Sequence, residues 1–312
     1  FEPVSLIPTV IIAGAISVYF RTHARSSLLS SPIYYGMGIG FIGFCVFNLG
    51  LLATLAMPAL SFEIGLACLV VSVLTCVKSI LNGRHISLKT LHISSPKITQ
   101  HYNLVFISDI HLGSNPRQHL EKICTMIKRL DYDYLLIGGD LYDSSSFVPE
   151  DLMPLTAIQK PILFVTGNHE YYVKNHAEKV ANLSNYNIML LDNESAQFDE
   201  LNIIGISDNQ APKLQSDIAH GLVNQDAFNL LMVHQPSIWD NAPNNTDLML
   251  SGHTHNGQII PFNFLVRLQF KTVYGIYKRL NSTLYVSSGS GTWGPRMRLG
   301  TKNEIVHISI SP

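Results

Sequence analysis

Charged residues are scarce in this chain of 312 residues: they make up 14% of it, against about 25% in a typical soluble domain. The net charge of −1 provides no excess of basic side chains for a polyanion, so no nucleic acid partner is expected, and no segment indicates a protein partner. Cysteine is scarce as well. The four cysteines fit neither a disulfide framework nor a Cys-x-x-Cys zinc motif.

The charge deficit is concentrated at the start of the chain, where the first 80 residues hold only five of the 43 charged side chains. Three apolar stretches fill this part: Val4 to Phe20, Ile33 to Leu60 and Ile64 to Val77. A membrane-spanning helix needs roughly 20 predominantly apolar residues. The pattern therefore predicts a transmembrane helical region of about three spans over residues 1–80, followed by a globular domain over residues 85–312.

Two other interpretations of these stretches are weaker. A secretory signal has an apolar region of only about 7–15 residues, which is shorter than the first stretch. Surface helices of a soluble domain need a polar face, which uninterrupted apolar runs lack.

Basic residues beside the stretches predict the orientation. Arg21 and Arg25 follow the first stretch, Lys78 and Arg84 follow the third, and the turn between the second and third has no Lys or Arg. With three crossings, both basic segments lie on one side of the membrane, and the positive-inside rule places that side in the cytoplasm. We therefore expect a multi-pass membrane protein whose globular domain lies on the cytoplasmic side.

The hydrophobic period changes beyond residue 85. His85 to Ile93 alternates as a strand does, and three short β-rich runs follow at Asn103 to Ser108, Tyr134 to Ile137 and Ile162 to Thr166. Helical patterns such as Gln118 to Leu130 separate these runs, which is typical of βαβ units and a largely parallel sheet. Later predicted strands come with fewer helices. The pattern predicts an α/β domain of two sheets packed face to face, with helices outside.

Polar side chains directly follow five of the predicted strands. In open α/β sheets, the carboxyl ends of the strands face the ligand crevice. Asp109 and Asp140 are 31 residues apart, and Asp140 and Asn168 are 28 apart. One βαβ unit takes roughly 30 residues, so successive motifs return to the same edge. The sequence predicts a metal pocket there, formed by Asp109, His111, Asp140, Asn168, His234, His253 and His255.

The predicted ligands indicate two ions. Imidazole, carboxylate and amide oxygen together suit first-row metals such as Mn, Fe or Zn. Seven side chains exceed the coordination sphere of one ion. Two ions about 3.5–4 Å apart share a carboxylate and act on phosphoryl groups by clamping the attacking and leaving oxygens. The expected cofactors are two divalent metal ions.

These motifs resemble a known family. Asp109-x-His111, Gly139-Asp140, Gly167-Asn168-His169-Glu170, His234 and Gly252-His253-x-His255 are similar to the five-block signature of the calcineurin-like metallophosphoesterases. Gly257-Gln258 and the run from Gly289 to Arg296 further resemble the bacterial membrane-associated branch related to YkuE and YaeI. The resemblance implies a two-sheet β-sandwich flanked by helices, and location in the bacterial inner (cytoplasmic) membrane. Glu170 stands where many members carry Asp.

The resemblance also implies roles for the site residues. One ion would be held by Asp109, His111 and His255, the second by Asn168, His234 and His253, and Asp140 would bridge them. The chain would be a metal-dependent phosphoric ester hydrolase in which a hydroxide held between the ions attacks phosphorus. His169 would donate a proton to the leaving oxygen or stabilise the transition state. Arg117 and Arg296 are candidate phosphate contacts, because arginine binds phosphate bidentately.

A membrane lipid is the leading substrate. The domain follows the apolar stretches closely, and Phe262 to Leu280 mixes aromatic and basic side chains, as membrane interfaces do. A packed loop would explain that segment equally well. The expected reaction is hydrolysis of a phosphoester or pyrophosphate in a phospholipid or lipid-linked headgroup. Two alternatives remain: a phosphodiesterase or phosphatase acting on soluble cytoplasmic substrates, and a membrane scaffold with a vestigial metal site.

Overall fold

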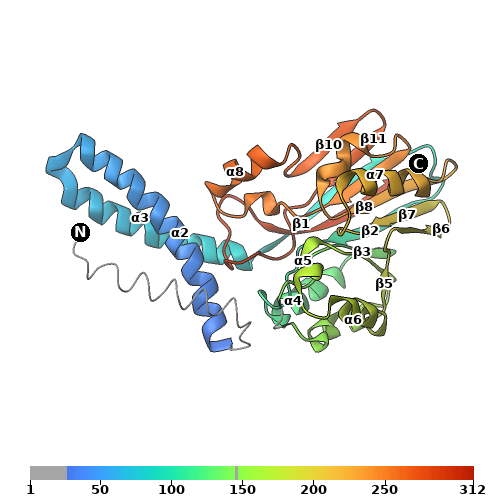
Figure 1. Cartoon of the computed structure of the whole chain (residues 1–312), viewed down its shortest axis with the longest axis horizontal. Coiled ribbons are helices and arrows are strands. Elements are labelled where there is room, and N and C mark those ends of the chain that lie inside the picture. The colour runs from blue at the N-terminus through green and yellow to red at the C-terminus, as the bar shows by residue number, and fades with distance from the viewer. Residues whose placement is uncertain (1–26, 145–146) are drawn as a thin grey trace.

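The computed structural model describes residues 27–144 and 147–312, in which a helical hairpin projects from an α/β domain (Figure 1). The hairpin consists of α2 (Ser27–Ala56) and α3 (Ser61–Arg84), joined by the short 3-10 helix η2 (Pro58–Leu60). Pro58 fits the first turn of η2, where its missing N–H is not needed. Both helices are long and apolar enough to span a membrane.

The projecting part of the hairpin exposes large apolar side chains. Phe44, Leu55 and Phe62 are 67%, 71% and 78% exposed. Side chains of this kind would be buried in a soluble helical domain, so the hairpin indicates membrane association. The helices α2 and α3 correspond to the second and third predicted spans, and α3 continues to Arg84. The first predicted span, Val4 to Phe20, lies outside the described residues.

The near ends of both helices are docked onto the domain. Ile42 of α2 and Cys76 of α3 pack against Ile259 and Met297 in one buried cluster. A Cβ atom on Gly83 would lie 2.7 Å from the carbonyl oxygen of Arg296, so the backbones approach as closely as glycine allows. The hairpin is therefore a packed part of the domain at its base.

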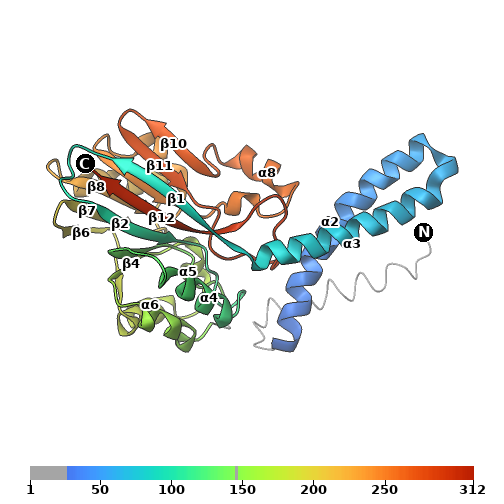
Figure 2. The same ribbon diagram turned by 180° about the vertical axis from the view of Figure 1, so that it is seen from behind.

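The domain contains two six-stranded sheets (Figure 2). In spatial order, the strands of the first sheet are β1 (Ile86–Ser94), β12 (Asn303–Ser311), β2 (Tyr102–Ile107), β3 (Tyr134–Gly138), β4 (Ile162–Val165) and β5 (Ile188–Leu190). The strands β2 to β5 are parallel neighbours, β12 runs antiparallel to β2, and β1 runs parallel to β12 at the edge.

The second sheet has a parallel centre with an antiparallel strand at each edge. In spatial order its strands are β10 (Gly275–Arg279), β11 (Ser282–Val286), β9 (Thr246–Ser251), β8 (Phe228–Val233), β7 (Leu201–Ile206) and β6 (Glu194–Phe198). The predicted largely parallel sheet is thus mixed, because β12 returns from the C-terminal end to pair with β2.

The main core lies between the two sheets, where Phe106, Leu136, Leu230 and Leu250 are fully buried. The outer face of the first sheet is covered by α4 (Arg117–Ile127), η3 (Pro149–Ala157) and η4 (Asn182–Tyr186). The outer face of the second is covered by α7 (Pro212–Leu222) and η5 (Pro236–Asn241). The short helices α5 (Asn168–Tyr172), α6 (His176–Ala181), η6 (His255–Gly257) and α8 (Phe262–Gln269) follow strands or loops beside these layers. The predicted two-sheet fold with outer helices and N-terminal apolar helices is confirmed.

Candidate metal centre

The carboxyl ends of β2, β3, β4, β8 and β9 bring the predicted ligands together. Nε2 of His111 lies 3.0 Å from Nε2 of His255, and Nδ1 of His253 lies 3.3 Å from Nε2 of His234. Two imidazole nitrogens bound to one ion at about 2.1 Å lie roughly 3.0–3.4 Å apart. Each histidine pair is therefore spaced as two ligands of one ion.

Asp140 lies between the two pairs. Its Oδ2 is 3.1 Å from Nε2 of His234 and 3.7 Å from Nε2 of His111. Asp109 joins the first pair, with Oδ1 3.5 Å from Nε2 of His255. Burial raises the pKa of Asp140, but the neighbouring histidines, His234 above all, outweigh it and hold the pKa well below its usual range. An ionised carboxylate in this position suits a bridge between two cations.

Asn168 supports the fit to metal independently. Its Oδ1 is buried and has no hydrogen-bond partner among the described residues. A buried carbonyl oxygen without a partner costs about 1–3 kcal/mol, and a bound cation would remove that cost. Together with the histidine spacing, this oxygen indicates that the donor set could hold divalent metal ions.

The backbone at the site is strained. Asp109, His111, Asp140, His253 and His255 have φ values between 49° and 70°, in the left-handed region. A residue other than glycine pays about 1–2 kcal/mol for this conformation, and such residues cluster at functional sites. Gly139 allows the close approach of the ligand loops, because a Cβ atom there would lie 2.5 Å from Nδ1 of His234. The fold thus holds these side chains in positions that the local sequence disfavours.

Two of the predicted ligand histidines have a polar group close to their second nitrogen. The carboxylate of Asp143 lies 3.2 Å from Nδ1 of His111, and Nδ1 of His234 lies 2.8 Å from the carbonyl oxygen of Gly138. Such partners fix the ring so that Nε2 faces the ion. We did not predict Asp143 from the sequence. Its place three residues after Asp140 was the available signal, since a ligand histidine usually has a carboxylate or carbonyl partner.

Glu170 is fully buried and holds two ligand loops together. Its carboxylate accepts hydrogen bonds from the backbone N–H groups of Asp140, Leu141, Tyr142 and Gly167, at 3.0, 2.7, 3.2 and 2.6 Å. Asp140 follows β3 and Asn168 begins α5 after β4, so Glu170 links the two backbone segments that carry these side chains. The sequence marked this residue only as a departure from the family pattern.

His169 lies at the edge of the cluster. Its Nε2 is 4.0 Å from Oδ2 of Asp140, and its ring packs edge-on against His111 and Trp293. Burial lowers the pKa of His169 below its usual value, although the charge of Asp140 acts in the opposite direction. The side chain remains 17% exposed, so it borders the open side of the centre.

The two predicted phosphate contacts lie elsewhere. The Arg117 guanidinium pairs with Glu121 at 3.0 Å on the surface of α4. The Arg296 guanidinium donates to the carbonyl oxygen of Ser114 and to Oγ of Ser31, and lies 5.3 Å from the centre of the Tyr34 ring. Neither arginine lines the cavity over the metal centre. Arg296 joins α2 to the domain instead.

A cavity of about 720 Å³ lies over the cluster. The inner end of this cavity is lined by His111, Asp140, Asn168, His169, His253 and His255. The remaining walls come from loop residues such as Trp293, from the α8 segment and from α2, which contributes Met37 and Phe41. The predicted metal centre and one helix of the apolar hairpin therefore share a cavity.

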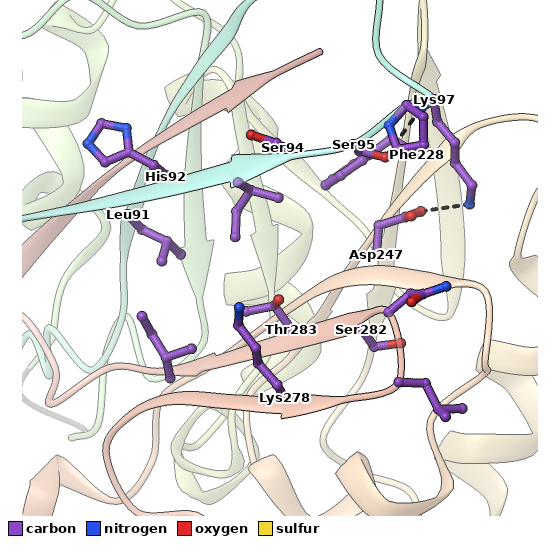
Figure 3. Close-up of a pocket in the computed structure, with 15 residues that line it drawn as sticks. Leu91, His92, Ser94, Ser95, Lys97, Phe228, Asp247, Lys278, Ser282 and Thr283 are labelled. Atoms are coloured by element: carbon purple, nitrogen blue, oxygen red, sulfur yellow. Dashed lines mark hydrogen bonds and ion pairs between the residues drawn. The ribbon is translucent and has the colours of Figure 1, made fainter.

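Another cavity, of about 600 Å³, lies between β1 and the β10–β11 hairpin (Figure 3). Its polar lining includes Lys97 and Asp247, which form an ion pair of 2.9 Å, and Lys278. None of the predicted ligands lines this cavity. The chemistry indicated by the motifs therefore belongs to the first cavity.

A sandwich of two mixed sheets with clustered His, Asp and Asn side chains at the strand ends is typical of metal-dependent hydrolases. A family model described as calcineurin-like phosphoesterase matches residues 102–257. The chain belongs to this family of phosphoester hydrolases, which use divalent metal ions. The predicted family and the predicted class of enzyme are confirmed.

Several relatives share substantial identity. An uncharacterized metallophosphoesterase of Helicobacter pylori is 34% identical over 72% of this chain, which spans 64% of that protein's length. A bovine protein named transmembrane protein with metallophosphoesterase domain is 30% identical over 80% of this chain and 62% of its own length. The Bacillus subtilis protein YpbG is 32% identical over 72% of this chain and 87% of its own length. The crystal structure of the phosphopantetheinyl hydrolase of Mycobacterium tuberculosis aligns with a TM-score of 0.41 at 12% identity, covering 64% of this chain and 92% of that one.

Proposed function

We propose that this chain is a membrane-anchored phosphoesterase with two metal ions, which hydrolyses a phosphoester or pyrophosphate in a phospholipid or lipid-linked headgroup. The observation that carries this proposal is the shared cavity. Five of the seven predicted ligands line it, while Met37 and Phe41 belong to the candidate membrane span from Ser31 to Ala56. A lipid headgroup would reach the ions from this side while its chains stay in apolar surroundings.

The outer face of α8 supports contact with the bilayer. Phe264 is 59% exposed and Leu268 is 84% exposed, and α8 lies on the side of the domain that faces the hairpin (Figures 1 and 2). Exposed apolar side chains on a helix beside a membrane segment are typical of interfacial helices. Side chains of the segment from Phe262 to Leu280 point in different directions: Phe270 lines the cavity, whereas Phe264 is exposed to the outside. The bovine relative named as a transmembrane protein agrees with anchoring.

The residues have distinct roles in the proposed reaction. Asp109, His111 and His255 would hold one ion, Asn168, His234 and His253 the other, and Asp140 would serve both. Bound divalent ions, which we propose to be Mn, Fe or Zn, neutralise charge on phosphoryl oxygens and lower the pKa of water to about 7. His169 would hold a proton on Nε2 and transfer it to the leaving oxygen.

The proposed location is the bacterial inner membrane, with the domain on the cytoplasmic side. The basic residues Lys78 and Arg84 at the end of α3 support this orientation through the positive-inside rule. A soluble cytoplasmic substrate would not need a membrane helix in the cavity wall. The scaffold alternative leaves the seven clustered ligands and the strained backbone that holds them without a role.

The outer face of α8 separates lipid from soluble substrates experimentally. We expect that replacing both Phe264 and Leu268 by Ser lowers hydrolysis of lipid phosphoesters in vesicles at least tenfold, because α8 would lose its contact with the bilayer. Hydrolysis of a small chromogenic phosphodiester should change less than twofold, since neither residue lines the cavity. Both rates are measured on the metal-loaded full-length enzyme reconstituted in vesicles.

Leu214→Ser provides the matched control. Leu214 is 47% exposed on α7, which lies at the end of the domain away from the hairpin (Figure 1). This variant should keep both rates. Equal losses on both substrates in the α8 variant would show that its side chains serve folding. An unmodified enzyme that prefers soluble esters over every lipid tested would favour the anchor alternative.

A further inference from the structure

The cavity over the metal centre has two facing apolar stripes. Phe262, Val266 and Phe270 are spaced four residues apart along α8 and its end, so they share one side of the helix. Met37 and Phe41 are spaced the same way on α2. The rings of Phe41 and Phe262 are 6.5 Å apart and meet edge to face. The two helices thus form the walls of one apolar slot.

This slot begins at the metal centre. The ring of Phe270 lies 5.3 Å from the ring of His253, one of the predicted ligands. From there the apolar lining continues through Val266 and Phe262 to α2. A phosphoryl group bound at the ions would therefore place the group attached to it beside Phe270.

Two polar side chains in the lining, those of Gln258 and Thr254, are already bonded to the protein. Gln258 accepts a hydrogen bond from the N–H of Trp293 at 2.9 Å and donates to the carbonyl oxygens of Trp293 and Pro295. The Thr254 hydroxyl donates to the carbonyl oxygen of Val273 at 2.6 Å. Gln269 is exposed. A polar or charged substituent beside Gln258 or Thr254 would lose its hydration without gaining either side chain as a partner.

We propose that the slot between α2 and α8 binds a single hydrocarbon chain attached to the phosphoryl group of the substrate. This inference rests on the proposed function and specifies how the lipid is held. It makes α2 a substrate-binding element as well as an anchor, because Met37 and Phe41 would contact the chain. Since Met37 and Phe41 belong to a candidate membrane span, the hydrocarbon chain would enter the slot from the bilayer without crossing water.

The length of the alkyl chain in the substrate tests this assignment. Two substrate series are used, p-nitrophenyl alkyl phosphodiesters and alkyl phosphates, each from methyl to hexyl and kept below the concentration at which micelles form. Full-length metal-loaded protein is reconstituted in vesicles, because free detergent would compete for the slot. In the series that the enzyme hydrolyses, kcat/KM should rise up to about fourfold per methylene, the equivalent of about 0.8 kcal/mol.

Substituted proteins separate binding in the slot from partition of the substrate into the vesicle. Val266→Trp fills the slot from α8 and should bring the hexyl-to-methyl ratio of kcat/KM close to one. Leu265→Trp adds the same bulk to the neighbouring residue, which is 58% exposed and does not line the cavity, and should keep the unmodified ratio. Met37→Trp fills the slot from the opposite wall and should repeat the effect of Val266→Trp.

Each outcome decides the question. Equal ratios in all four proteins, or no dependence on chain length in the unmodified enzyme, would overturn the slot while leaving the phosphoesterase activity established. If Val266→Trp is inactive on every ester, the ratio measured for Met37→Trp decides. A metal-loaded enzyme that hydrolyses no member of either series would overturn the proposed function, and the slot with it.

Discussion

Replacement of Asp140 by Ala should remove at least one metal ion per chain. Hydrolysis should fall by at least about 10³-fold, because metal-assisted catalysis is lost. Oδ2 of Asp140 lies 3.1 and 3.7 Å from Nε2 of His234 and of His111, so we propose that this side chain serves both halves of the centre. Its removal would then leave each ion short of one ligand. Elemental analysis and a chromogenic phosphodiester assay on the same preparation measure the two effects.

Asp217→Ala is the matched control for this experiment. Asp217 lies on the exposed surface of α7, where it pairs with Lys213. An exposed pair of this kind contributes little, so this variant should keep its ions and its activity. Retention of both ions and full activity in Asp140→Ala would contradict the bridging role.

The His169→Ala variant should keep its ions yet lose roughly 10²–10⁴ in rate, the usual size of an acid–base contribution. In the proposed centre the seven other side chains supply the ligands, and His169 lies at the edge with Nε2 4.0 Å from Oδ2 of Asp140. The donating form is protonated and exists below the pKa of His169, which burial lowers. Activity that depends on this donor should fall as the pH rises through that pKa, and the dependence should vanish in the variant.

His176→Ala is the control for loss of a histidine, since His176 is exposed on α6 and contacts Tyr171. It should match the unmodified enzyme in metal content and rate. Loss of metal from His169→Ala would show that His169 is itself a ligand, and the proton-donor role would have to be withdrawn.

The sequence was most informative where polar side chains recur at the ends of successive strands. Asp109, Asp140 and Asn168 recur at nearly the length of one βαβ unit, and each follows a strand, so their meeting at one edge could be predicted. The left-handed backbone at Asp109 and Asp140 could not be predicted, because it arises from contacts between loops that are distant in the sequence.

Features that depend on docking between distant segments were missed. Met37 lies 72 residues before the first predicted ligand, and nothing in its apolar surroundings marks it as part of a catalytic cavity. Arg296 looked like a phosphate contact because arginine suits phosphate, but its guanidinium bonds to Ser114 and to Ser31 of α2. Whether Arg296 binds phosphate or these protein groups depends on where α2 packs, which is a property of the whole fold.

A similar case is Arg298, which is fully buried beside the metal centre. Its guanidinium donates to the carbonyl oxygen of His255 at 3.0 Å, and its backbone N–H donates to the carbonyl oxygen of Ser79 in α3 at 2.9 Å. A buried arginine is rare and requires several acceptors, which here come from segments far apart in the chain. One residue therefore connects a predicted metal ligand to the base of the hairpin.

We propose that seven side chains at the strand ends hold two catalytic metal ions. Elemental analysis of purified, active full-length protein tests it most directly, combined with chelation and restoration by Mn, Fe or Zn under a phosphodiester assay. We predict about two ions per chain, activity that disappears on chelation, and recovery as two ions are restored. Full activity with one ion per chain, or with none, would show that the proposed dinuclear centre is wrong.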